Sequence, residues 1–245
     1  MILCLKMLPI LIGMPIKAVW NLLVGDIFKL IKQIPDSSFD LIDADPPYGV
    51  SYNTMVDDWK DDWSDWDEKS YKEKFPKLIR EFYRVLSPTG WLIVWLASRN
   101  QDATIDMLED NKFKVWRVPS IWVKTPGSCI QPKVQLKNSF EPFLYAHKGH
   151  GEIATQGRPN VFMFSHGDNR IHQAEKPVEL MKNVLQTFGR TGDRVLIPFA
   201  GSGNTILAAH DLNMSAVGYD LSQKHQDKFI VRATGEENVE NTTKD

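Results

Sequence analysis

The stretch Phe39-Asp40-Leu41-Ile42-Asp43-Ala44-Asp45-Pro46-Pro47-Tyr48 joins a short apolar run to a stiff polar end. A run of this length bounded by turn residues is typical of a buried strand, so the sequence predicts a strand over Phe39–Ala44. Proline fixes its own φ, restricts the residue before it and has no N–H to donate. The Asp45 carboxylate and two carbonyls are therefore expected to point outward from the strand end as acceptors.

An array of acceptors suits a ligand that only donates hydrogen bonds, such as an NH2 group. Tyr48 adds a flat face on which a ring can stack. The residues from Asp45 to Tyr48 also fit a simpler alternative, a Pro-Pro turn that only ends the strand, because turns often use these residues.

The residues on both sides of this stretch continue an alternation of strands and helices. Strands are predicted at Ala18–Val24, Phe39–Ala44, Trp91–Ala97, Val115–Lys124, Glu141–Lys148, Arg194–Pro198 and Ser215–Asp220. Helices are predicted at Ile27–Ile34, Tyr71–Leu86, Asp102–Asn111, Pro177–Phe188, Thr205–Leu212 and Gln223–Thr234. This pattern is typical of an α/β protein with an open, mostly parallel sheet, here of seven strands, and helices on both faces. Val115–Lys124 and Glu141–Lys148 are expected to form an antiparallel edge.

The chain has 245 residues, of which 42% are hydrophobic, enough for the core of one domain. We expect an N-terminal extension at residues 1–17, one α/β domain at 18–235 with an irregular stretch at 125–172, and a polar tail at 236–245. Prolines and lysines interrupt the apolar N-terminal segment, so a membrane-spanning helix is not expected and an export signal is disfavoured.

The charge and the cysteines narrow the function classes. A formal net charge of -2 excludes a uniformly basic, histone-like protein, so any nucleic-acid surface must be local. The two cysteines, Cys4 and Cys129, lie far apart and lack His or Cys neighbours at ligand spacing. We therefore expect no disulfide framework, no metal site and a cytoplasmic setting.

A second motif, Ile197-Pro198-Phe199-Ala200-Gly201-Ser202-Gly203-Asn204-Thr205, joins an apolar strand to a helix. Its glycines let the backbone approach a ligand closely at a helix N-terminus, and no P-loop lysine follows them. Asp220 ends the next strand, where an acidic side chain can accept hydrogen bonds from ribose hydroxyls. Together these features indicate a cofactor that carries adenosine. The alternative is that Asp220 only caps the following helix.

With both motifs in view, the chain resembles the amino-methylating DNA methyltransferases of the permuted type, in which the catalytic tetrapeptide precedes the cofactor glycines. The resemblance covers most of residues 21–233. It is carried by Gly25-Asp26, Asp40-Leu41-Ile42, Asp45-Pro46-Pro47-Tyr48, Leu86-Ser87-Pro88-Thr89-Gly90, Trp122-Val123-Lys124, the glycine motif and His172-Gln173-Ala174-Glu175-Lys176-Pro177-Val178-Glu179-Leu180. Methyltransferases of glutamine side chains are disfavoured, because there the glycine motif comes first and the tetrapeptide usually begins with Asn.

The resemblance implies a Rossmann-like, S-adenosylmethionine-dependent methyltransferase fold for the catalytic domain. It also implies cofactor-binding roles for Phe199, Gly201, Ser202, Gly203, Asp220, Lys176, Pro177 and Asp26, with Lys176 and Pro177 near the methionine end. The chain departs from the usual pattern at Asp220, where the family more often has Glu. A shorter acid still reaches a ribose if the strand end lies closer.

The expected activity is methylation of the N6 amino group of adenine in DNA. That nitrogen is a poor nucleophile, since its lone pair is delocalised into the ring. The Asp45 carboxylate and the Pro46 carbonyl are expected to accept the two amino hydrogens and so to localise the lone pair, while Tyr48 stacks on the base. A base inside a duplex cannot enter such a pocket, so the target must be flipped out or single-stranded.

Contacts with DNA are expected from basic residues of the irregular stretch: Lys124, Lys133, Lys137, Lys148, Arg158 and Arg170. Scattered solvated charges are an equally good interpretation of these residues. Aromatic residues that follow the tetrapeptide either line the pocket or, as we favour, pack as an ordinary loop: Tyr52, Trp59, Trp63 and Trp66.

Two alternatives remain open. In this resemblance a leading Asp in the tetrapeptide points to adenine, but methylation of the N4 amino group of cytosine is the runner-up. A non-catalytic DNA-binding or decoy protein on the same fold is the alternative from another class. The space left for a recognition element is short, which predicts a short or relaxed recognition sequence, or dependence on a partner such as a second copy of the chain. Whether a restriction nuclease accompanies the protein is not decided by the sequence.

Overall fold

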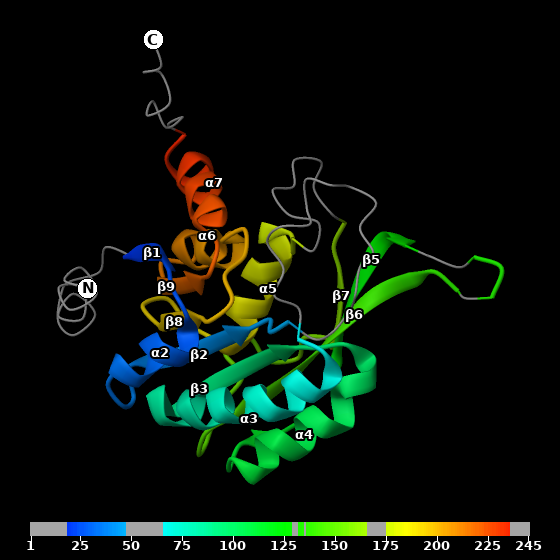
Figure 1. The fold of residues 1–245 in the computed structure, drawn as a ribbon, viewed down its shortest axis with the longest axis horizontal. Coiled ribbons are helices and arrows are strands. Elements are labelled where there is room, and N and C mark those ends of the chain that lie inside the picture. The colour runs from blue at the N-terminus through cyan, green and yellow to red at the C-terminus, as the bar shows by residue number, and fades with distance from the viewer. Residues whose placement is uncertain (1–18, 48–65, 129–131, 135, 166–174, 236–245) are drawn as a thin grey trace.

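The structure of the protein, a computed structural model, describes residues 19–47, 66–128, 132–134, 136–165 and 175–235 (Figure 1). The described strands form one nine-stranded sheet in the order β1-β9-β8-β2-β3-β6-β5-β7, with β4 beside β6. The strands are β1 Trp20–Val24, β2 Phe39–Ala44, β3 Leu86–Trp95, β4 Lys114–Val115, β5 Ser120–Ser128, β6 Asn138–His147, β7 Val161–Met163, β8 Arg194–Ile197 and β9 Ser215–Asp220.

Helices cover both faces of the sheet, as expected for this fold class (Figure 1). The helices are α2 Ile27–Leu30, α3 Glu68–Val85, α4 Gln101–Asp110, α5 Val178–Phe188, α6 Asn204–Asp211 and α7 Gln223–Thr234, with 3-10 turns η2 Ile31–Gln33 and η4 Ser98–Asn100. One apolar core lies between the sheet and α2, α3 and α4, and the other between the sheet and α5, α6 and α7. None of the described helices is long and apolar enough to cross a membrane.

The parallel strands β2 and β8 are neighbours at the centre of the sheet, although about 150 residues separate them along the chain. From β2 the chain continues through α3 to β3, and from β8 it continues through α6 to β9, so the two connections leave in opposite directions and over opposite faces. Such a topological switch point leaves a crevice at the carboxyl ends of the two strands, where ligands of open α/β sheets bind. The tetrapeptide follows β2 and the glycine motif follows β8.

The predicted sheet was right in class but wrong in detail. The structure has nine strands among its described residues rather than seven. The sequence reading missed β4 and β7, which are two and three residues long and too short for a periodic signal. The segment Ser87–Gly90, which lies between the predicted helix and the predicted strand, belongs to β3 and contains the register shift opposite β2.

The antiparallel pair of β5 and β6 is confirmed, but it is not the edge of the sheet. Strand β6 lies between β3 and β5 and runs antiparallel to both, and β7 adds a further parallel strand beyond β5. Because β6 runs in the opposite direction, its first residues lie beside the carboxyl ends of β2, β3 and β5.

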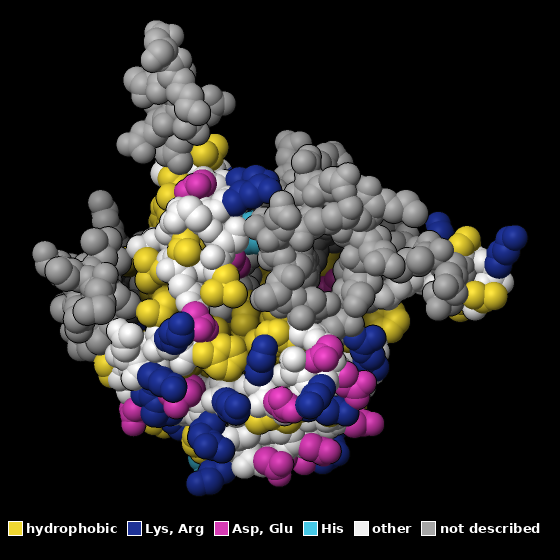
Figure 2. All heavy atoms as spheres, viewed as in Figure 1, with side chains coloured by type: hydrophobic (Ala, Val, Ile, Leu, Met, Phe, Trp, Pro, Cys, Tyr) yellow, Lys and Arg dark blue, Asp and Glu magenta, His cyan; other side chains and the backbone are white. Residues whose placement is uncertain are grey.

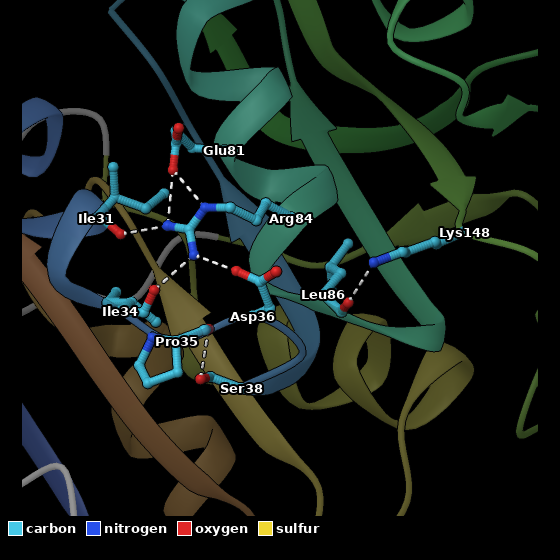
Figure 3. A network of polar contacts seen from close by, with 9 residues as sticks. All are labelled: Ile31, Ile34, Pro35, Asp36, Ser38, Glu81, Arg84, Leu86 and Lys148. Carbon is cyan, nitrogen blue, oxygen red and sulfur yellow. Dashed lines mark hydrogen bonds and ion pairs between the residues drawn. The ribbon is translucent and has the colours of Figure 1, made fainter.

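At the opposite edge of the sheet, Arg84 at the end of α3 ties down the segment between α2 and β2 (Figure 3). Its guanidinium donates to the carbonyls of Ile31 and Ile34 at 2.8 and 2.7 Å, and to Asp36 and Glu81 at 2.8 Å each. Carbonyls at the end of a helix need donors of this kind, and the Ile31 carbonyl accepts in addition from the Ile34 N–H at 3.1 Å. The guanidinium therefore fixes the entry into β2 from the side away from the tetrapeptide.

The substitution Arg84→Met is expected to lower the free energy of unfolding by about 2 kcal/mol, because it removes the charged donor that the Ile31 and Ile34 carbonyls share with two carboxylates. Denaturant unfolding of the purified variant measures the loss. The matched control is Lys72→Met on the exposed face of α3, where Lys72 pairs with Glu68 at 2.6 Å. That change is expected to cost less than about 0.5 kcal/mol, and equal losses in the two variants would contradict the role given to Arg84.

Candidate active site

The Asp45 carboxylate directly follows β2 at the switch point, and a buried lysine lies against it. Lys176 Nζ donates to Asp45 Oδ2, and the Lys176 side chain is only 8% exposed. The other oxygen, Asp45 Oδ1, is buried and has no hydrogen-bond donor among the described residues. A buried carboxylate oxygen without a donor is costly, so within the described part of the chain Asp45 Oδ1 stands out as an acceptor that is still available.

The lysine ammonium is held from three sides. It lies 4.5 Å from the centre of the Trp95 ring, and its second carboxylate neighbour is Glu141, with Oε2 at 3.6 Å. Burial by itself disfavours the ammonium, but the Asp45, Glu141 and Asp43 carboxylates outweigh burial and raise the pKa of Lys176. Lys176 is therefore protonated at neutral pH.

Asp43 lies two residues before Asp45, in β2, and is 3% exposed. Its two oxygens accept hydrogen bonds from Trp95 Nε1 at 2.9 Å and from Thr205 Oγ1 at 3.0 Å, so it ties β3 and α6 to β2. Burial raises the pKa of Asp43 to about 6. The sequence reading treated Asp43 as part of a strand and missed it, although a carboxylate inside an apolar run signals a polar contact.

Burial also raises the pKa of Asp45, and the neighbouring Lys176 ammonium opposes that effect. A carboxylate must be ionised to act only as an acceptor. The ammonium at Oδ2 thus favours the form of Asp45 that can receive an amino group at Oδ1.

The glycine motif forms a tight turn between β8 and α6. Gly201 and Gly203 have φ of +51° and +78°, in the left-handed region that favours glycine. A Cβ on Gly201 would meet no atom of the described residues within 4 Å, whereas a Cβ on Gly203 would come within 2.2 Å of the Phe229 ring. Gly201 therefore borders open space, and Gly203 is required by packing against α7.

Asp220, at the end of β9, lies beside this turn. Its Oδ2 accepts from the Gly201 N–H at 2.9 Å, and its Oδ1 contacts the Ser222 N–H at 2.9 Å and the His225 ring nitrogen Nδ1 at 3.0 Å. A carboxylate offers about four lone-pair sites, so these three contacts leave room for about one further donor. The helix that follows is capped by Ser222, not by Asp220 alone.

A buried network connects the glycine turn to the segment that carries Lys176. Asn204, the first residue of α6, donates to Glu175 Oε1 and to the Lys176 carbonyl, both at 2.9 Å. Arg232 of α7 donates to Glu175 at 2.9 Å and to Asn204 at 2.6 Å. These contacts fix the Lys176 backbone relative to both motifs, and the sequence reading missed Asn204 and Arg232 because they come together only in the fold.

The remaining predicted cofactor residues lie around the same edge. Phe199 is partly buried and packs edge-on against Trp66 at 5.9 Å, and Ser202 is buried. Pro177 precedes the first turn of α5, and Asp26 caps α2 through the Phe28 N–H at 3.0 Å. Trp66 is 6% exposed within the core, which confirms the packing interpretation for that residue.

The predicted DNA contacts do not form one group. Lys124 lies inside the site in an ion pair with Glu141, and Arg158 donates to Asn183 of α5 at 2.8 Å. Lys133 and Lys137 are exposed on the segment that joins β5 to β6. Lys148 donates to the Leu86 carbonyl at 2.9 Å, at the end of the strands opposite to Asp45 (Figure 3).

Several predicted residues lie outside the described residues: Tyr48, Tyr52, Trp59, Trp63 and Arg170. Within the part of the chain that the structure describes, no group of three or more His, Cys, Asp or Glu residues is arranged to hold a metal ion.

A rigid acceptor at the end of β2 and a glycine turn at the end of β8, on this sheet, define a Rossmann-like methyltransferase. The chain belongs to the DNA methylase family of N6/N4 methyltransferases, whose model matches residues 39–159 and 155–231.

Individual relatives agree with this assignment. DNA adenine methyltransferase YhdJ of Escherichia coli (strain K12) is 25% identical over 240 residues, which cover 82% of this chain and 78% of YhdJ. The structure of M1.HpyAVI in complex with SAM has a TM-score of 0.69 at 20% identity and covers 87% of this chain and 98% of that one. The cytosine-N4-specific PvuII DNA methyltransferase has a TM-score of 0.70 at 16% identity, covering 93% and 89%.

The substitution Asp43→Asn is expected to change how stability depends on pH. The pKa of Asp43 is raised from 3.8 to about 6 in the folded protein, so between these values the folded state keeps a proton that the unfolded state has lost. Stability therefore falls as pH rises through this window and is level above it. Asparagine cannot ionise, so from pH 4 to pH 7 the variant should gain about 3 kcal/mol relative to the natural protein.

Denaturant unfolding of both proteins at several pH values from 4 to 7 measures this difference. The other carboxylates titrate in both proteins, so the difference isolates Asp43. Parallel curves for the two proteins would show that Asp43 titrates as an ordinary exposed carboxylate.

Proposed function

We propose that this protein transfers the methyl group of S-adenosylmethionine to the exocyclic N6 amino group of an adenine in DNA. The observation that carries the proposal is the geometry of Asp45, with Oδ2 bound by Lys176 and Oδ1 buried and without a donor among the described residues. An amino group is a donor that suits this oxygen. Membership of the DNA methylase family supports DNA as the polymer that contains the amino group.

The chain contributes position and electrostatics to this reaction. Asp45 Oδ1 accepts one amino hydrogen and the carbonyl of Pro46 accepts the other, which localises the nitrogen lone pair in the direction of the methyl group. Pro46 and Pro47 have no N–H, so the turn offers the base no competing donor. The acceptors are buried at the edge of the sheet, and a base reaches them only when it is flipped out of the duplex or is single-stranded.

The residues of the glycine turn fit the proposed cofactor. Gly201 borders open space, and Asp220 retains about one acceptor site toward it, which matches a ribose hydroxyl. Phe199 adds an apolar wall, and the network of Glu175, Asn204 and Arg232 holds Lys176 between this turn and Asp45. When bound, S-adenosylmethionine would supply the methyl group of its sulfonium and leave as S-adenosylhomocysteine, and the methylated nitrogen would lose one proton to Asp45 or to water.

The choice of adenine rests on the leading Asp of the tetrapeptide and on the similarity to YhdJ, whose name specifies adenine. The similarity to the cytosine-N4-specific PvuII enzyme supports N4 of cytosine as the second candidate. Both bases present an amino group beside a ring nitrogen, so the Asp45 acceptor serves either one. A decoy function is disfavoured by the open acceptor and the intact glycine turn.

We assign the contact with the duplex to the segment between β5 and β6. Basic and apolar side chains gather at the end of this hairpin, which stands away from the body of the protein (Figure 2). Its described tip carries Lys133 and Lys137 together with the exposed Val134 and Leu136. Over α3 and α4, in contrast, acidic and basic side chains alternate, which does not suit a phosphate backbone.

The substitution Asp45→Asn is expected to lower the methylation rate at least a hundredfold, because the amide cannot replace the ionised acceptor beside Lys176. Affinity for S-adenosylmethionine should stay within about threefold, since the glycine turn is unchanged. The measurement is transfer of labelled methyl groups to duplex DNA, followed by digestion to nucleosides and mass spectrometry.

The identity of the product decides between the two bases. Methyladenine that is absent with Asp45→Asn supports the proposal, and methylcytosine transfers the same mechanism to the second candidate. Cofactor binding by calorimetry without any methylated product would favour the decoy function.

The two glycines are expected to respond differently to alanine. Gly203→Ala should cost about 3 kcal/mol of stability, because a Cβ at φ +78° would also clash with Phe229. Gly201→Ala should cost about 1 kcal/mol, because only its φ of +51° is unfavourable, yet it should weaken S-adenosylmethionine binding at least tenfold. Thermal unfolding and calorimetry on the same samples separate the two effects. Unchanged cofactor affinity in Gly201→Ala would indicate that the cofactor does not bind at this turn.

A further inference from the structure

Four adjacent strands place a row of acidic and tryptophan side chains on one face of the sheet, at the edge that holds the site. Asp43 comes from β2 and Asp45 directly follows it, while Trp95 comes from β3, Glu141 from β6, and Trp122 with Lys124 from β5. Trp122 and Glu141 are paired in the register of β5 and β6, which makes them direct neighbours on the same face.

Two lysines complete this row. Lys176 lies over the Trp95 ring and contacts Asp45 and Glu141, while Lys124 lies 5.4 Å from the centre of the Trp122 ring and pairs with Glu141. The side chains of Glu141 and Lys124 are only 16% and 14% exposed. The result is a partly desolvated chain of alternating charges in the order Asp45, Lys176, Glu141, Lys124.

Glu141 occupies the decisive place in this chain, because it is the second carboxylate neighbour of Lys176. Charged groups that are removed from water interact strongly. The position of an ammonium between two carboxylates therefore depends on its attraction to each of them. If Glu141 were absent, Lys176 would have Asp45 as its nearest remaining carboxylate and would be drawn further onto it. The open state of Asp45 Oδ1 therefore depends on a residue two strands away.

We propose that Glu141 is a positioning residue for methyl transfer: it holds Lys176 over Trp95, so that Lys176 pairs with one oxygen of Asp45 and leaves the other for the substrate amino group. Lys124 in turn neutralises Glu141 and fixes its orientation. This inference rests on the proposed transfer at Asp45, and it assigns a role in that transfer to residues of β5 and β6.

The electrostatic consequence has a definite sign. The described charged groups around Asp45 are Asp43 on β2, Lys176 before α5, Glu141 on β6 and Lys124 on β5. The Glu141 charge raises the pKa of Asp45, and the Lys124 charge lowers it. Removing the two charges one at a time should therefore shift the titration of Asp45 in opposite directions.

The experiment is a carbon NMR titration of the protein labelled at its aspartate carboxyl carbons, with Asp45→Asn to assign the Asp45 signal. Glu141→Gln should lower the pKa of Asp45 by about one unit, because both carboxylates contact the same Lys176 ammonium and repel each other across it. Lys124→Gln should raise it by about half a unit. Glu109→Gln is the matched control, since Glu109 pairs with Arg117 on the exposed side of α4 and should leave the signal unchanged.

Methylation kinetics supply the second readout. Glu141→Gln should lower kcat about tenfold with KM for DNA and cofactor within twofold, because a misplaced Lys176 affects the reacting geometry and not the binding surfaces. Thermal unfolding verifies that both variants are folded. Lys124→Gln tests the contribution of the Lys124 charge while Glu141 is still present.

Opposite shifts of the Asp45 titration, together with the loss confined to kcat, would support the proposal. Shifts in the same direction, or shifts no larger than in Glu109→Gln, would overturn it. Because the titration needs no turnover, an inactive natural protein would count against the proposed methyl transfer alone.

Discussion

The pairing of β2 with β8 is the constraint on which the rest of the structure depends. It joins residues about 150 positions apart through Leu41 opposite Val195 and Ile42 opposite Leu196, and it places the two motifs at one switch point. The bidentate contact of Arg194 with Asp40, at 2.9 and 3.0 Å, fixes the register at the start of both strands. A shift of one residue would turn Asp43 and Asp45 to the other face, away from Lys176.

Given this register, the stability of the site depends on two opposing effects: the cost of removing charged groups from water and the gain from their mutual contacts. Removing several charges from water costs more than any single contact returns, so each group in the site has several partners. Lys176 has two carboxylate neighbours and an aromatic face, and Asp43 has two donors. Asp45 Oδ1, in contrast, is buried and has no donor among the described residues. The structure thus leaves an unsatisfied acceptor at the atom that the proposed reaction uses.

The sequence predicted the elements with strong local signals and missed the contacts that depend on distant pairing. Strands β2 and β9 and helix α7 match their predicted bounds, and the two motifs lie at the strand ends where they were expected. Glu141 gave no functional signal, because its importance depends on the reversal of β6, which brings the start of that strand to the active edge. Lys124 was interpreted as a DNA contact for the same reason: its partner was not visible in the sequence.

The two tryptophans explain why a chain of charges is tolerated at this edge. Aliphatic side chains at these positions would desolvate the lysines without compensation, whereas the face of an indole ring attracts an ammonium and remains apolar. Trp95 serves twice, since its ring lies under Lys176 and its Nε1 donates to Asp43. A single side chain therefore connects the charge state of the buried Asp43 with the position of the cation beside Asp45. Through Trp95 the apolar core contacts both Asp43 and Lys176, so a substitution of Trp95 is expected to alter the environment of the Asp45 acceptor.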